Sequence, residues 1–202
     1  MSAHLKHRYT LEEYFDLELS ENARYEYWNG EVFCMSGMSE EHDQIEGNIY
    51  LALRLALRER GCRVFTANMR IQVPSLPPYR YADASALYGQ AVFEEIGGVD
   101  TLTNPTFIVE VLSDSTEAYD RGDKFTHYKS IPSFREYLLV AQHRPHITQY
   151  VKQDDGSWSY CEVNDLAASV HLPSVDCVMG LNEVYQDVTF PPNPSLNLQL
   201  PS

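Results

Sequence analysis

The sequence predicts a mixed α/β (α+β) fold, with a central β-sheet flanked by helices. Apolar residues recur at helical spacing in some segments, while others have the short, apolar composition of strands. One strand segment is almost entirely apolar, as expected for a strand buried on both faces of its sheet. The 202 residues are 44% hydrophobic and 22% charged, which excludes collagen-like, coiled-coil and disordered chains. We expect one domain over residues 1–190 and a loose Pro-rich tail over 191–202.

The N-terminal segment predicts a helix followed by a hairpin. A short helix is expected over residues 10–19, because Thr10 can cap it and Glu13 stands three positions later, where a capping-box partner belongs. Residues 24–35 read as a β-hairpin, since two strand-like segments flank Asn29-Gly30, a strong two-residue turn signal.

A longer helix should follow, from its cap at Ser39 to about Arg60, where Gly61 ends it. Two further helices are expected over 120–130 and 181–185. A loop of about 17 residues leads to Pro105. Strands are expected over residues 62–66, 69–73, 81–88, 106–112, 136–141, 147–151 and 157–163.

The net charge of −14 argues against non-specific binding to nucleic acid. Residues 54–80 are the exception, because they hold six arginines against a single acid, Glu59. Guanidinium groups match phosphate oxygens, so these arginines could form a phosphate-facing strip, or they could be a solvated helix end and strand edges. The candidates for contact with a nucleic-acid backbone are Arg54, Arg58, Arg70 and Arg80.

Cysteine spacing and hydropathy indicate the cellular compartment in which the protein is expected. The four cysteines are scattered without a C-x-x-C pair, so we expect reduced thiols and no structural zinc. No segment approaches the roughly 18 apolar residues of a membrane span, and the N-terminus has no apolar signal-peptide core. We therefore expect a cytoplasmic protein with no membrane partner.

Two acids interrupt strand segments that otherwise carry no charge. Glu110 lies in the middle of the apolar segment 107–112, and a buried carboxylate needs a cation, an arginine or a raised pKa. Asp83 lies between small alanines in the segment 81–88. Two strands that each carry one inward acid can hold a hard cation such as Mg²⁺ or Mn²⁺ between them. The alternatives are a structural ion pair for Glu110 and a strand-end position for Asp83.

Other charged residues could join such a site. Lys124 falls at the border of the apolar side of the helix 120–130, where it could orient a water or offset charge on a phosphate, or simply be solvated. Glu26 and Glu31 flank the hairpin turn and could add a carboxylate, or be exposed hairpin charges. His42 and Glu46 share a helix face and are interpreted as a polar pair at the start of the helix rather than as ligands.

These residues stand in a pattern that resembles the Uma2 (DUF820) family of endonucleases, over about Tyr9 to Tyr185. The order and spacing of the matching segments are more specific than any one of them. The segments are Arg24–Val32, Met35–Ser39 with His42, Tyr79–Asp83, Pro105–Thr116, Tyr119–Phe125 and Ile131–Val140.

The resemblance implies a restriction-endonuclease-like fold and a PD-(D/E)xK-type site in which Asp83 and Glu110 bind the metal. Ala82 replaces the proline of that pattern, and Leu112 stands where the superfamily has its lysine. Lys124 is the candidate for a relocated lysine, and Glu26 or Glu31 for an additional acid. The implied activity is Mg²⁺- or Mn²⁺-assisted hydrolysis of phosphodiester bonds in nucleic acid, with DNA as the expected substrate.

Three alternatives or extensions accompany this interpretation. A catalytically silent nuclease fold that acts as an interaction or DNA-binding module is favoured by the acidic charge and by Leu112. An idle pair of buried carboxylates would repel itself, which disfavours that alternative. Hydrolysis of a small phosphate ester lacks a Gly-rich phosphate loop. Related folds often dimerise to cut both strands, so a homodimer is expected as a partner.

Overall fold

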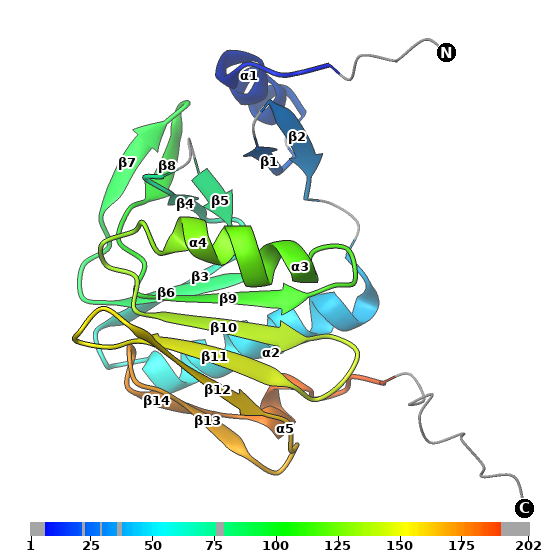
Figure 1. Ribbon diagram of the computed structural model, residues 1–202, viewed down its shortest axis with the longest axis vertical. Helices are drawn as coiled ribbons and strands as arrows, with labels where there is room; N and C mark the ends of the chain where they lie inside the picture. The colour runs from blue at the N-terminus through cyan, green and yellow to red at the C-terminus, as the bar shows by residue number, and fades with distance from the viewer. Residues whose placement is uncertain (1–6, 22, 29, 36–37, 76–78, 191–202) are drawn as a thin grey trace, which may run out of the picture.

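The computed structural model describes residues 7–190, apart from 22, 29, 36–37 and 76–78. The predicted tail 191–202 lies outside the described residues. A six-stranded mixed sheet crosses the centre of the protein (Figure 1). Among its described strands, β9 (Phe107–Leu112) and β10 (Glu136–Ala141) are parallel, and the other neighbouring pairs are antiparallel. Its strands, in spatial order, are β12 (Trp158–Val163), β11 (Ile147–Lys152), β10 (Glu136–Ala141), β9 (Phe107–Leu112), β6 (Ala84–Tyr88) and β3 (Cys62–Thr66).

One face of this sheet is covered by α2 (Glu40–Leu57). The predicted cap is confirmed, since the side chain of Ser39 accepts a hydrogen bond from the backbone N–H of His42 at 3.2 Å. A second hairpin, which the sequence did not reveal, joins α2 on this face together with a last helix. These elements are β13 (Ser169–Leu172), β14 (Cys177–Gly180) and α5 (Leu181–Val184).

The opposite face carries the connection from β9 to β10, visible in front of the sheet in Figure 1. The sequence predicted one helix over 120–130. The connection instead has three consecutive parts, of which the middle one is a π-helical turn that buries both Asp120 and Lys124. An aromatic cluster packs it on the sheet, with Phe125 stacked on Tyr137 at 5.1 Å between ring centroids. The parts are α3 (Glu117–Tyr119), η1 (Asp120–Lys124) and α4 (Phe125–Tyr128).

A smaller four-stranded sheet corrects two sequence expectations. The expected strand 81–88 is in fact two strands in different sheets, with Ala82 and Asp83 between them. The expected loop before Pro105 contains a hairpin whose turn, Gly97-Gly98, has positive φ at both residues, which only glycine adopts without strain. In spatial order the strands are β5 (Tyr79–Tyr81), β4 (Arg70–Gln72), β8 (Val99–Leu102) and β7 (Phe93–Ile96).

The predicted N-terminal helix and hairpin are present as α1 (Leu11–Glu21), β1 (Tyr25–Trp28) and β2 (Glu31–Cys34). The capping box is also confirmed. The backbone N–H of Thr10 donates to Glu13 Oε2 at 2.7 Å, and the N–H of Glu13 donates to Thr10 Oγ1 at 3.2 Å. None of the helices in residues 7–190 that the structure describes is long and apolar enough to cross a membrane.

A buried ion pair attaches the N-terminal helix to the smaller sheet. Glu18 of α1 accepts hydrogen bonds from Arg70 and from the hydroxyls of Tyr79 and Tyr81, the last two at 2.5 and 3.0 Å. The side chains of Arg70 and Glu18 are 6% and 1% exposed. Arg70 is therefore a structural residue, and its burial gives no support to the expectation that it contacts a nucleic-acid backbone.

Because Arg70 is desolvated, replacing Glu18 by Gln is expected to lower the free energy of unfolding by about 3 kcal/mol, the cost of leaving a buried charge without its partner. Urea unfolding followed by circular dichroism measures the loss. Glu117→Gln is the matched control, since it removes the exposed ion pair with Arg121 and should cost less than about 1 kcal/mol. Equal losses in the two variants would contradict a structural role for the buried pair.

Candidate active site

Asp83 and Glu110 meet where the two sheets adjoin. The β6–β9 ladder ends with the pair Ala84 and Val109, so the next position of the same register brings Asp83 beside Glu110. Asp83 is held there by the backbone N–H of Val111, which donates to its Oδ2 at 2.6 Å. The structure thus brings the two predicted acids together at one end of β6.

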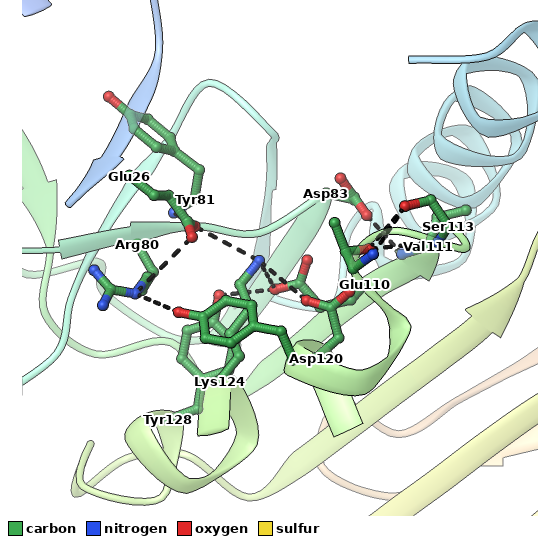
Figure 2. A network of polar contacts seen from close by, with 12 residues as sticks. Glu26, Arg80, Tyr81, Asp83, Glu110, Val111, Ser113, Asp120, Lys124 and Tyr128 are labelled. Atoms are coloured by element: carbon green, nitrogen blue, oxygen red, sulfur yellow. Dashed lines mark hydrogen bonds and ion pairs between the residues drawn. The ribbon is translucent and has the colours of Figure 1, made fainter. Parts of the chain in front are cut away.

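Glu110 lies under the connection that crosses the sheet (Figure 2). Its Oε1 accepts a hydrogen bond from the hydroxyl of Tyr128 at 2.8 Å and lies 2.9 Å from Nζ of Lys124. Burial raises the pKa of Glu110 well above its usual value, and the ammonium group of Lys124 opposes that rise. A carboxylate in this position is stabilised by whatever positive charge lies beside it.

Lys124 is the cation at the centre of this network. It is 3% exposed, and its Nζ also lies 3.6 Å from Asp120 Oδ1 and 3.6 Å from Glu26 Oε1. Burial alone lowers the pKa of Lys124, but these three carboxylates outweigh it and raise the pKa well above its usual value. The lysine is therefore held in its charged form beside Glu110.

The two hairpin acids have different positions. Glu26 is buried, accepts the backbone N–H of Tyr81 at 3.1 Å, and lies 4.0 Å from Nε of Arg80, so it contacts cations and the backbone rather than Asp83 (Figure 2). Glu31 is half-buried and lines a neighbouring cavity of about 570 Å³ that also reaches Lys124. Glu26 thus positions Lys124 from the hairpin side.

His42 and Glu46 approach Asp83 from α2, on the other side of the sheet. His42 Nε2 lies 3.3 Å from Asp83 Oδ1, and one ligand atom from each of the three residues lies within 4.8 Å of the others. Burial and the charge of Asp83 raise the pKa of Glu46 to about 7. The interpretation of His42 and Glu46 as a mere helix-start pair missed this proximity. Their spacing of four residues, one helical turn, was the available signal.

A cavity of about 440 Å³ opens onto these groups. Acidic, basic and hydroxyl side chains from both faces of the sheet line it, together with apolar residues of the segment after β2. The lining residues are Arg24, Cys34, Met35, Met38, Ser39, His42, Ala67, Tyr81, Ala82, Asp83, Glu110, Val111, Ser113, Asp114, Ser115, Thr116, Asp120, Lys124 and Gln142.

The four arginines considered for contact with a nucleic-acid backbone do not line this cavity. Arg80 is fully buried, and its Nε donates to the hydroxyl of Tyr119 at 3.1 Å, so it is not available to a phosphate backbone. Arg54 on α2 and Arg58, which caps the C-terminal end of that helix, are exposed, but they follow His42 by more than three helical turns. At about 1.5 Å per residue they lie roughly 18–24 Å further along the helix.

The donor set fits a divalent cation. Asp83 and Glu110 offer carboxylate oxygens, the ligands that hard cations prefer. Burial and mutual repulsion raise the pKa of Glu110, with Asp83 and Asp120 among the causes, so a cation between the carboxylates would relieve their repulsion. Lys124 alone offsets only part of the negative charge gathered here.

Known proteins resemble this chain along most of its length. The profile of the Uma2 family, described as "Putative restriction endonuclease", matches residues 11–181. Two uncharacterised proteins of Synechocystis sp., slr1290 and sll1609, are each 30% identical to it. The alignment with slr1290 covers 89% of this chain and 92% of that relative. The alignment with sll1609 covers 76% of this chain and 86% of that relative.

A solved structure supports the fold. It is a crystal structure from Anabaena variabilis, described as that of "a putative nuclease belonging to DUF820". It superposes with a TM-score of 0.69 and covers 88% of this chain and 97% of its own, at 16% sequence identity. The family profile spans all three residues that meet beneath the cavity, Asp83, Glu110 and Lys124. The chain belongs to the Uma2 family, and its fold is that of a restriction-endonuclease-like nuclease.

Proposed function

We propose that the protein is a metal-dependent endonuclease that hydrolyses phosphodiester bonds, with DNA as its substrate. The observation that carries the proposal is the meeting of Asp83, Glu110 and Lys124 at one cavity, with Nζ of Lys124 2.9 Å from Glu110. Two carboxylates and a lysine are the groups that the implied family site requires. Here the lysine comes from η1, while Leu112 occupies the usual strand position.

In this proposal Asp83 and Glu110 hold Mg²⁺ or Mn²⁺. Such an ion supplies a Lewis acid for a phosphate oxygen and lowers the pKa of a bound water. It also supplies the positive potential that a chain of net charge −14 needs near a polyanion.

Lys124 has two roles in this proposal, and the carboxylates around its Nζ position it for both. Its ammonium group donates hydrogen bonds and can orient the attacking water beside Glu110. As negative charge develops on the phosphate, the fixed positive charge stabilises it without reorganisation. Glu26 and Asp120 keep that ammonium in place, each at 3.6 Å. Tyr128 fixes the carboxyl of Glu110 through its hydroxyl.

Metal removal tests the proposal directly. Supercoiled plasmid is incubated with the wild-type protein at low salt in Mg²⁺, in Mn²⁺ and in EDTA. We expect nicked or linear plasmid with either metal, none in EDTA, and recovery when excess Mg²⁺ is added back. Intact plasmid with both metals, or cutting that persists in EDTA, would contradict metal-dependent cleavage. Retarded but uncut DNA in a gel shift would instead support the silent binding module.

A further inference from the structure

Two buried polar atoms beside Asp83 have no hydrogen-bond partner among the residues that the structure describes. They are Nε2 of His42 and Oε2 of Glu46. His42 is only 8% exposed, and α2 directs it toward Asp83. A buried polar atom without a partner costs free energy, so such atoms call for a specific explanation.

The distances among the three residues suit a shared ion. Nε2 of His42 is 3.3 Å from Asp83 Oδ1, and one atom each from His42, Glu46 and Asp83 lie within 4.8 Å of one another. Two atoms that each lie about 2.1 Å from one cation are roughly 3.0–4.2 Å apart, depending on the angle at the ion. The three side chains therefore need only small shifts to bind one ion.

We propose that His42, Glu46 and Asp83 form a mixed nitrogen and oxygen site for a divalent first-row transition metal, with Nε2 of His42 as a direct ligand. The inference rests on the proposed function, because it adds ligands from α2 to the metal that Asp83 holds in that same centre. It changes the expected metal, since imidazole favours transition metals over Mg²⁺, which prefers oxygen ligands. Asp83 then lies between the α2 ligands on one face of the sheet and the Glu110–Lys124 pair on the other face.

A second histidine shows what a structural pair looks like in the same molecule. His146 Nε2 lies 3.3 Å from Glu162 Oε1, the same separation as in the His42–Asp83 pair, and the two histidine side chains are equally buried. His146 also contacts the hydroxyl of Thr148 at 3.4 Å. Nε2 of His42 has no such partner, and it faces a cavity that His146 does not line.

Mn²⁺ is the probe for this site, because its electron spin reports directly on a coordinated nitrogen. The full-length protein is titrated with Mn²⁺ while the free ion is followed by electron paramagnetic resonance. The bound ion is then examined by spin-echo modulation for coupling to ¹⁴N. We expect ¹⁴N coupling in the wild type and its loss in His42→Ala. The Kd for Mn²⁺ should rise by about 100-fold in that variant, because loss of a direct ligand should weaken binding at least as much as loss of a residue that only supports a ligand. His146→Ala should retain both the coupling and the affinity.

Bound Mn²⁺ without ¹⁴N coupling in the wild type would overturn the inference, and that result does not depend on whether a variant folds. Unchanged Mn²⁺ affinity in His42→Ala, or displacement of Mn²⁺ by an equal concentration of Mg²⁺, would overturn it as well. Plasmid cutting without ¹⁴N coupling leaves the proposed nuclease standing and removes only this ligand set. Coupling to ¹⁴N without plasmid cutting would support this ligand set and contradict the proposed nuclease activity.

Discussion

Replacing Lys124 by Met is expected to lower the free energy of unfolding by about 4 kcal/mol, within the range for breaking a buried ion pair. Methionine fills a similar volume, but it leaves Glu110, Asp120 and Glu26 facing one another without their shared cation. Cleavage should fall by about 10²- to 10³-fold, as for loss of one preorganised group that stabilises charge in the transition state. Urea unfolding in EDTA and plasmid nicking measure the two effects.

The stability deficit should depend on pH in a defined direction. Burial raises the pKa of Glu110 and Lys124 opposes that rise, so the pKa climbs further when the lysine is removed. A carboxyl whose pKa is higher in the folded than in the unfolded state binds more protons when folded, and its contribution to stability grows as the pH falls. The deficit of Lys124→Met should therefore shrink between about pH 8 and pH 5.

Two further variants separate the causes. Lys129→Met removes an exposed lysine of the same segment, whose Nζ lies 4.8 Å from the ring centre of Phe125, and should cost less than about 1 kcal/mol. Adding Glu110→Gln to Lys124→Met should recover part of the lost stability, because one unpaired charge disappears, while cleavage stays low. A deficit that grows toward acid pH, or full activity of Lys124→Met, would show that the lysine does not have the role assigned to it.

Asp83→Asn is expected to reduce cleavage by about 10³-fold or more, since it removes a carboxylate that the proposed metal needs. In EDTA its stability should change little, within about 0.5 kcal/mol. The asparagine oxygen can still accept the N–H of Val111. Burial is the main cause of the raised pKa values of Glu46 and Glu110, and the substitution relieves the repulsion by Asp83 that adds to it. The variant separates metal binding from folding, because it impairs only the first.

The same nicking and unfolding assays check this prediction. Asp100→Asn, an exposed acid in β8 of the smaller sheet, serves as the control and should retain full activity. Strong destabilisation of Asp83→Asn in EDTA would mean that Asp83 is chiefly a structural residue. Cleavage at the wild-type rate would exclude it as a metal ligand.

The sequence predicted the elements with strong local signals. The capping box at Thr10, the cap at Ser39 and the apolar stripe of α2 depend on neighbours within one or two turns, and the structure has them all. The hairpin at Gly97-Gly98 was missed because acids at Glu94 and Glu95 hide the apolar alternation of its strands.

Long-range placement was harder to predict. Asp83 and Glu110 were identified because an acid in an apolar strand is costly wherever the strand lies. The burial of Arg70 and Arg80 was not predicted, because their partners, Glu18 and Tyr119, are distant in the sequence. A charge run along the chain does not reveal which of its members the fold buries.

The position of Glu26 next to Lys124 has a consequence for synthesis of the protein. The N-terminal hairpin that carries Glu26 is synthesised early. The segment that carries Lys124 follows only after more than half of the chain has been made, together with the strands β9 and β10 on either side of it. A growing chain therefore holds its acids in water, without the lysine that completes the cluster. The proposed cleavage therefore requires a chain long enough to have formed the β9–β10 connection, which supplies Lys124.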